Sequence, residues 1–162
     1  MKTIIIGLGN PILRDDSVGP RAARLIGQRL DAEDRVDISV SEVYAGGIRL
    51  LDAMTSYDRA IVIDSIVTGS NAPGTVYRLT PDSLSQTRNC GSSHDMTLPM
   101  ALRMGRALGM ALPFEVHIWA VEVQDVNTFG EWLSVEVESS LPDVVNGVLR
   151  MCGDCSVKGS RA

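Results

Sequence analysis

The chain has 162 residues, among them 20 Asp and Glu against 15 Lys and Arg, so its formal net charge is −5. This length suits one domain with a substantial core, and the acidic balance argues against a nucleic-acid-binding protein, which normally carries a basic face. With only two His residues the chain cannot build a three-histidine zinc site, so metal or acid–base chemistry must depend mainly on carboxylates.

The opening apolar run is too short for a signal peptide, and no stretch approaches the roughly 18 apolar residues that a membrane-spanning helix requires. We therefore expect a cytoplasmic protein without a membrane segment. No internal repeat or interdomain linker is visible, so we expect one domain over residues 1–152 and a flexible tail over residues 153–162.

Five segments have the apolar or alternating pattern of β-strands, at residues 3–7, 36–43, 59–64, 75–79 and 117–123. Apolar side chains at helical spacing predict helices over residues 18–30, 48–54 and 96–112 and again from residue 134, where Pro142 is expected to kink or split the helix. Residues 80–93 are expected to be irregular. Because strands and helices alternate, the sequence predicts an α/β fold with a largely parallel sheet and helices on both faces.

Two acidic residues stand where such a sheet usually has its site, in the loops at the carboxyl ends of strands. Asp16 lies in the Gly-rich loop over residues 7–19, which is not a dinucleotide-binding motif because Gly-x-Gly-x-x-Gly fails at Ile12. Asp64 ends the most apolar strand, where an unpaired buried charge would be costly. Neighbouring Asp15 is expected to cap the following helix, whereas Asp16 either caps it or points into a cleft shared with Asp64.

His94 ends the long polar segment just before a helix, a place where a histidine is either a surface or capping residue or a ligand in the same cleft. Two carboxylates and one imidazole would suit a borderline divalent ion such as nickel or zinc and leave coordination positions open. His117 lies in a strand beside Trp119 and is expected to pack in the core. Cys152 and Cys155 are expected to be structural thiols, because one CxxC pair outside a strand-to-helix context is a weak sign of a zinc or redox site.

These segments resemble, in order and spacing, the motifs of the hydrogenase maturation protease family. The residues GLGNPILRDDSVG at 7–19 are similar to its GxGNxLxxD(D/E)xxG signature, and IDSI at 63–66 and PGTV at 73–76 are similar to its D(A/S) strand end and PGT turn. SHDM at 93–96 resembles its third motif, a His before an amphipathic helix. The resemblance extends from about residue 3 to residue 149, although Tyr44-Ala45 stands where many relatives have an acid before the Gly46-Gly47 pair.

The resemblance implies a three-layer αβα sandwich around a twisted, mostly parallel mixed sheet of about five strands. It also implies an endopeptidase that removes a C-terminal peptide from the large-subunit precursor of a nickel–iron hydrogenase. Asp16, Asp64 and His94 would contact the nickel that the precursor holds, which makes nickel a recognition element of the substrate and not a tightly bound cofactor. Asp16 and Asp64 are then the expected catalytic residues of an aspartic-type or metal-assisted reaction, and the protein is expected to act as a monomer.

Two alternatives follow from the same residues. A peptidyl-tRNA hydrolase also has GLGNP after its first strand, but it continues with Arg-His-Asn, whereas this chain has Arg14-Asp15-Asp16 there, and an acidic protein suits tRNA poorly. A non-catalytic nickel-binding assembly factor could use the same three ligands, because the sequence contains no evident nucleophile–base pair.

Overall fold

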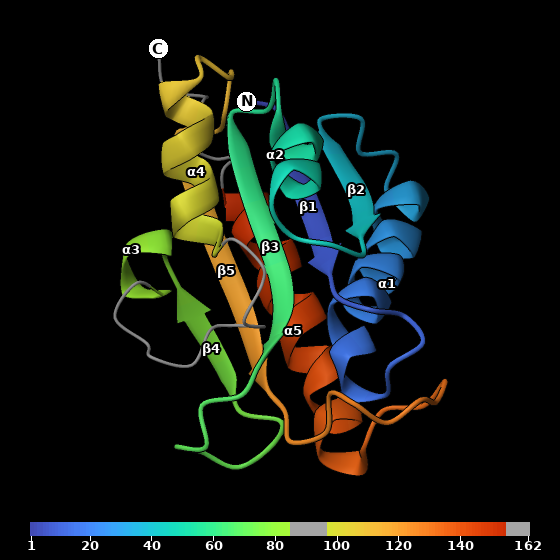
Figure 1. The fold of residues 1–162 in the computed structure, drawn as a ribbon. Helices are drawn as coiled ribbons and strands as arrows, with labels where there is room; N and C mark the ends of the chain where they lie inside the picture. Colours follow the sequence, from blue (N-terminus) through green and yellow to red (C-terminus); the bar gives the residue numbers. More distant parts are fainter. Residues whose placement is uncertain (85–96, 155–162) are drawn as a thin grey trace.

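Five strands form one twisted sheet in the computed structural model, which describes residues 1–84 and 97–154 (Figure 1). The order is β2-β1-β3-β5-β4. The pairs β1/β2, β1/β3 and β3/β5 are parallel, and β4 pairs antiparallel with β5, so the sheet is mixed and mostly parallel as predicted. The strands are β1 (Thr3–Leu8), β2 (Ile38–Val43), β3 (Arg59–Ile66), β4 (Val76–Leu79) and β5 (Glu115–Glu122).

Helices cover both faces of this sheet, which gives the predicted three layers (Figure 1). On one face α1 and α5 pack against residues such as Ile5, Ile61 and Trp119, and on the other α2 and α4 pack against Ile4 and Val62. Consecutive residues of a strand thus pack into the hydrophobic cores on opposite faces of the sheet, because side chains alternate along a strand. The helices are α1 (Val18–Ala32), α2 (Ile48–Met54), α3 (Pro81–Leu84), α4 (Leu98–Ala107) and α5 (Val135–Asp154). None of the described helices is long and apolar enough to cross a membrane.

Several elements differ from their predicted bounds, among them the three described next. A one-turn helix, α3, occupies the start of the segment expected to be irregular, and the rest of that segment lies outside the described residues. Helix α4 ends at Ala107, five residues early, because Gly109 adopts a left-handed conformation with φ of 76°. Strand β3 continues to Ile66, two residues past Asp64, because β5 pairs with it that far.

Of the two effects predicted for Pro142, a kink or a split of the last helix, the split is wrong. Helix α5 is continuous over 20 residues with Pro142 inside it. A proline in a helix interior removes one backbone hydrogen bond and costs about 3 kcal/mol. Val137 before the proline and Val144 and Val148 after it are all buried against the sheet, so packing on both sides holds the helix together.

The prediction that His117 packs in the core is also wrong. Its side chain is 31% exposed, and Nε2 contacts Glu115 two residues away on the same side of β5. Strand β4 pairs with β5 only as far as Ile118, which leaves the first residues of β5 open on that side. Cys152 is buried in the α1/α5 core, whereas Cys155 and the rest of the predicted tail after residue 154 lie outside the described residues.

Candidate active site

The carboxylate of Asp16 is held between the loop after β1 and strand β3. One oxygen accepts a hydrogen bond from the backbone N–H of Asn10 in the loop after β1, at 2.9 Å. The other accepts a hydrogen bond from the hydroxyl of Ser65 on β3, at 2.6 Å. Of the two possibilities left open by the sequence, Asp16 therefore points toward the strand ends, and its carboxylate is not used to cap α1.

Three glycines let the loop that carries Asp16 approach the sheet so closely. A Cβ on Gly9, which has φ of 145°, would overlap the carbonyl oxygen of Asp16. A Cβ on Gly7 would overlap Gly19, and one on Gly19 would overlap the carbonyl oxygen of Ile63, the residue before Asp64. The first turn of α1 thus rests directly on β1 and β3, which brings Asp16 to the part of β3 that carries Asp64.

From Asp64 onward, β3 is paired with β5 but no longer with β1. Strand β1 pairs with β3 only as far as Ile63, whereas β5 continues to pair with Asp64 and the two residues after it. The Asp64 carboxylate accepts a hydrogen bond from the N–H of Ser65 at 2.8 Å. Burial of this carboxyl group, and after it the negative charge of Asp16, raises the pKa of Asp64 to about 7.

These two acids offer different chemistry within one small site. Among the residues that the structure describes, Asp16 has donors on both of its oxygens, while Asp64 has one donor and a pKa near neutrality. A carboxyl group that titrates near the working pH can take up and release a proton, which is the requirement for general acid–base catalysis. The paired oxygens are also the kind of ligand that a divalent cation would bind.

Asp15, next in the chain to Asp16, turns the other way. The prediction that it caps the helix that follows it is wrong, because its carboxylate accepts hydrogen bonds from the N–H and the hydroxyl of Ser134, at 2.7 and 2.9 Å. Ser134 directly precedes α5, so Asp15 places a negative charge at the start of a helix distant in sequence, where the helix dipole favours it. Asp15 is almost fully buried.

Glu122 is a buried acid that the sequence analysis missed. Its carboxylate at the end of β5 accepts hydrogen bonds from the N–H and hydroxyl of Thr68, the N–H of Gly69 and the hydroxyl of Tyr77. Desolvation raises the pKa of Glu122, but these hydrogen bonds outweigh it and the pKa is lowered. The charge anchors the loop that follows Asp64 on β3. An acid at the end of an apolar strand is the signal that drew attention to Asp64, and the same signal could have found Glu122.

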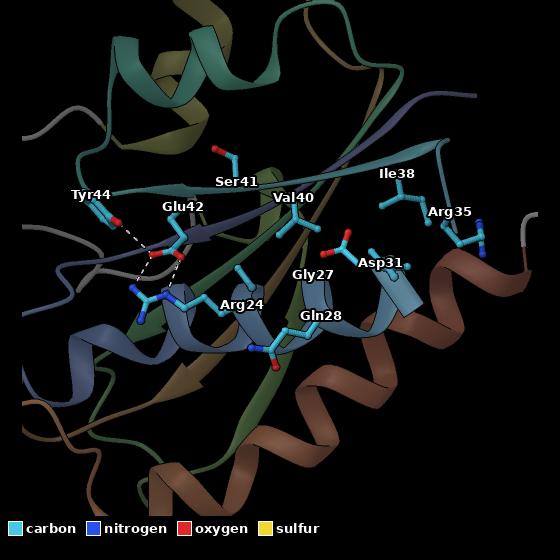
Figure 2. Close-up of a pocket in the computed structure, with 12 residues that line it drawn as sticks. Arg24, Gly27, Gln28, Asp31, Arg35, Ile38, Val40, Ser41, Glu42 and Tyr44 are labelled. Carbon is cyan, nitrogen blue, oxygen red and sulfur yellow. Dashed lines mark hydrogen bonds and ion pairs between the residues drawn. The ribbon is translucent and has the colours of Figure 1, made fainter. Parts of the chain in front are cut away.

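The described residues also line a groove of about 620 Å³ on the outer side of α1 and β2 (Figure 2). Its rim contains an ion pair in which the Arg24 guanidinium donates two hydrogen bonds to Glu42, at 2.7 and 2.8 Å, and the Tyr44 hydroxyl donates a third at 3.0 Å. Neither Asp16 nor Asp64 lines this groove. It is thus separate from the two acids of the candidate site.

Comparison with known proteins shows the family of this chain. The sequence model described as hydrogenase maturation protease matches residues 21–151. The chain belongs to the hydrogenase maturation protease family. The hydrogenase 2 maturation protease of Escherichia coli (strain K12) is 36% identical over 76 residues, which are 47% of this chain and 45% of that relative, so the match spans about half of the relative's length.

Solved structures of this family share the fold. The hydrogenase maturating endopeptidase HybD from E. coli has a TM-score of 0.78 at 24% identity, with 96% of this chain and 94% of that chain covered. The [NiFe] hydrogenase maturation protease HybD from Thermococcus kodakarensis has a TM-score of 0.72 at 23% identity, with 93% of this chain and 99% of that chain covered. The three-layer α/β fold predicted from the sequence is therefore confirmed.

Two of the three site residues expected of a hydrogenase maturation protease, Asp16 and Asp64, are among the described residues. The structure brings Asp16 and Asp64 together through Ser65. His94, the third expected residue, lies outside the described residues. Within residues 1–84 and 97–154, no three His, Cys, Asp or Glu side chains gather closely enough to hold a metal ion. The matched range of the family begins after Asp16 and includes Asp64 and His94. A match over a range assigns no role to a single residue, so the roles of all three stay predictions.

Proposed function

We propose that this protein is an endopeptidase that removes the C-terminal peptide from the nickel-containing precursor of a hydrogenase large subunit. The observation that carries the proposal is the linked pair of carboxylates, in which Ser65 donates one hydrogen bond to Asp16 and another to Asp64. Membership of the hydrogenase maturation protease family supports the substrate class and the reaction. A polypeptide substrate also suits a chain with a net charge of −5 better than a nucleic acid would.

In this proposal Asp16, Asp64 and His94 contact nickel that the precursor already holds. Two oxygen ligands and one imidazole make an open and weak site for a borderline cation. Such a site can recognise a metal without removing it from thiolate ligands, which bind nickel more tightly. Nickel thereby reports that the precursor is loaded, and it leaves with the processed product.

Asp64 is the residue we propose to handle the proton during hydrolysis. With a pKa of about 7 its carboxylate can accept a proton from a water molecule as that water attacks the peptide carbonyl, and can return the proton to the leaving amine. Asp16, with a donor on each oxygen, stays in place as an acceptor beside it. Polarisation of the carbonyl by the precursor's nickel is the metal-assisted form of the same reaction.

The proposal is tested by incubating the purified protein with the precursor in its nickel-loaded and nickel-free forms and measuring the intact mass of the precursor. We expect a single cut near the C-terminus of the nickel-loaded form and no change in the nickel-free form. Stable binding of the nickel-loaded precursor without any loss of mass would contradict the proposal and favour the alternative, a non-catalytic assembly factor.

A further inference from the structure

The end of β3 that carries Asp64 and Ser65 is paired with a neighbouring strand on one side only. Strand β1 stops pairing with β3 at Ile63, whereas β5 pairs with the next three residues, as far as Ile66 opposite Glu122. Strand β5 lies between β3 and β4 in the sheet (Figure 1). The positions of Asp64 and Ser65 therefore depend on how this end of β3 is held to β5.

The carboxylate of Glu122 binds the chain directly after this end of β3. One oxygen accepts hydrogen bonds from the backbone N–H groups of Thr68 and Gly69, at 2.8 and 3.1 Å. The other accepts from the hydroxyls of Thr68 and Tyr77, at 2.6 and 2.8 Å. Glu122 is only 2% exposed, and a carboxylate buried in this way requires such donors. The four hydrogen bonds fix the path of the chain shortly after Ser65.

The backbone at residues 122 and 123 holds both ends of the same loop. The N–H of Glu122 donates to the carbonyl of Thr75, and its carbonyl accepts from the N–H of Gly74, both at 2.8 Å and just before β4. The N–H of Val123 donates to the carbonyl of Ile66, the last residue of β3, at 2.9 Å. The end of β5 thus holds the loop over residues 67–75 where it leaves β3 and where it enters β4.

Glu122 and Asp64 face the same side of the sheet. Side chains alternate along a strand, and Val62 and Ile66 on β3 and Ala120 on β5 all pack in the core with α2 and α4. Asp64 is opposite Ala120, so Glu122 is the next residue of β5 on that side. Packing alone would favour an apolar residue at this position. The donors of the loop after Asp64 are what the carboxylate of Glu122 serves.

We propose that Glu122 is a positioning residue for the hydrolysis, which holds the end of β3 so that Asp64 and Ser65 stay beside Asp16. This inference rests on the proposed function, because the residues that Glu122 positions are those of the proposed reaction. The hydrogen bond from Ser65 to Asp16 joins β3 to a separate loop, so a small displacement of the strand end would break it. Such displacements lower reaction rates strongly, because reacting groups must be held close to their productive geometry.

Two substitutions of Glu122 differ in whether they keep its contacts. Glu122→Ala removes all four hydrogen bonds of the carboxylate. Glu122→Gln keeps an oxygen for the N–H groups of Thr68 and Gly69, and its amide can donate to the two hydroxyls, which accept as well as donate. We expect Glu122→Ala to lower the kcat for nickel-loaded precursor about tenfold or more and to change KM by less than about twofold. Glu122→Gln should restore kcat to within about threefold of the unmodified protein.

The control for a general loss of stability is Met54→Ala. Met54 is fully buried at the opposite end of the sheet, where its carbonyl accepts from the N–H of Tyr57 just before β3 begins. The cavity in this variant lowers stability, but well below its unfolding temperature its kcat should equal that of the unmodified protein. If Glu122→Ala does not fold, Thr68→Val takes its place. It removes one of the four hydrogen bonds to Glu122 and should lower kcat about threefold.

Hydrogen exchange measures the same effect without precursor or nickel. The N–H of Ser65 donates to the Asp64 carboxylate, so the exchange rate of this amide reports directly on the end of β3. In Glu122→Ala the amides of Ser65, Thr68 and Gly69 should exchange about tenfold faster or more. In Glu122→Gln they should exchange at nearly the rate of the unmodified protein.

The outcomes separate this inference from the proposed function. An unchanged kcat in Glu122→Ala, or in Thr68→Val where that variant is used, would overturn the positioning role and leave the peptidase standing. Equal losses of kcat in Glu122→Ala and Glu122→Gln, an equal loss in Met54→Ala, or unchanged exchange of the Ser65 amide would overturn it as well. Absence of any cleavage by the unmodified chain would contradict the proposed function instead, and exchange of the Ser65 amide would still decide whether Glu122 holds the strand end.

Discussion

The hydroxyl of Ser65 donates a hydrogen bond of 2.6 Å to the carboxylate of Asp16, which lies 49 residues earlier in the chain. The backbone N–H of the same serine donates to the carboxylate of Asp64 at 2.8 Å. One small residue on β3 therefore contacts both acids of the candidate site. This arrangement links the loop after β1 to the strand that carries the second acid.

Removing this hydroxyl should loosen Asp16 without displacing it. In Ser65→Ala the N–H of Asn10 still donates to Asp16, and the N–H of residue 65 still donates to Asp64. A hydrogen bond to a charged group contributes about 1.5 to 3 kcal/mol, but the remaining donor and water limit the loss. We expect the rate of precursor processing to fall by about fivefold to tenfold. A rate equal to that of the unmodified protein would mean that the hydroxyl has no part in positioning Asp16.

Substitution of Asp15 should lower the free energy of unfolding, whereas substitution of Asp16 should lower activity. Asp15→Ala removes the carboxylate to which the N–H and hydroxyl of Ser134 donate at the start of α5. The free energy of unfolding should decrease by about 2 to 3 kcal/mol, measured by urea denaturation. At temperatures well below unfolding the variant should still process the precursor. Loss of processing in a variant of unchanged stability would show that Asp15 acts in the reaction and not in the fold.

The close approach of the Asp16 loop to the sheet can be tested at Gly9. In Gly9→Ala the added Cβ overlaps the carbonyl oxygen of Asp16, on a backbone with φ of 145°. Both stability and processing should decrease, the former by about 3 kcal/mol or more, because the loop must move. The matched control is Gly109→Ala, which also has a positive φ but meets nothing within 4 Å and should lose only about 1 kcal/mol. Equal losses of stability in the two variants would contradict this account, because the unfavourable φ alone would then explain the effect of Gly9→Ala.

The raised pKa of Asp64 predicts a definite dependence of stability on pH. The native protein binds the Asp64 proton more tightly than the unfolded chain, in which the pKa of this group is near 3.8. The contribution of this proton to the free energy of unfolding is therefore complete below about pH 4 and is lost as the pH rises toward 7. Asp64→Asn should therefore be the more stable protein at about pH 8, by about 2 kcal/mol after allowance for partial exposure. Its stability should also vary less with pH. Asp52→Asn, on an exposed carboxylate of α2, is the control, and parallel pH profiles for all three proteins would contradict the account.

Much of the fold could be predicted because buried strands have a local signature. Runs such as that around Ile61, apolar on both faces, indicate the centre of a parallel sheet, and all five predicted strands are present. The glycines at positions 7, 9 and 19 indicated a tight first loop. In the structure these positions have no room for a Cβ, because α1 and its preceding turn contact the strands directly. Local patterns sufficed wherever local geometry decided the outcome.

Other features could not be predicted because they depend on distant partners. Nothing near Asp15 indicates that its carboxylate binds Ser134, 119 residues later. The continuity of α5 through Pro142 depends on packing against the sheet, and the exposure of His117 depends on where β4 ends. Glu122 could have been noticed, but its four donors come from a loop and a strand whose positions the sequence does not reveal.

The most direct test of the central claim is the intact mass of nickel-loaded precursor after incubation with the unmodified protein and with Asp16→Asn, Asp64→Asn and His94→Ala. We expect the unmodified protein to release the C-terminal peptide, and each variant to do so at a rate lower by about 100-fold or more while its circular dichroism shows an intact fold. Asp52→Asn should cleave at the normal rate. Cleavage at an undiminished rate by Asp16→Asn or Asp64→Asn would contradict the account, because the two carboxylates that Ser65 joins would then not be the site of the reaction.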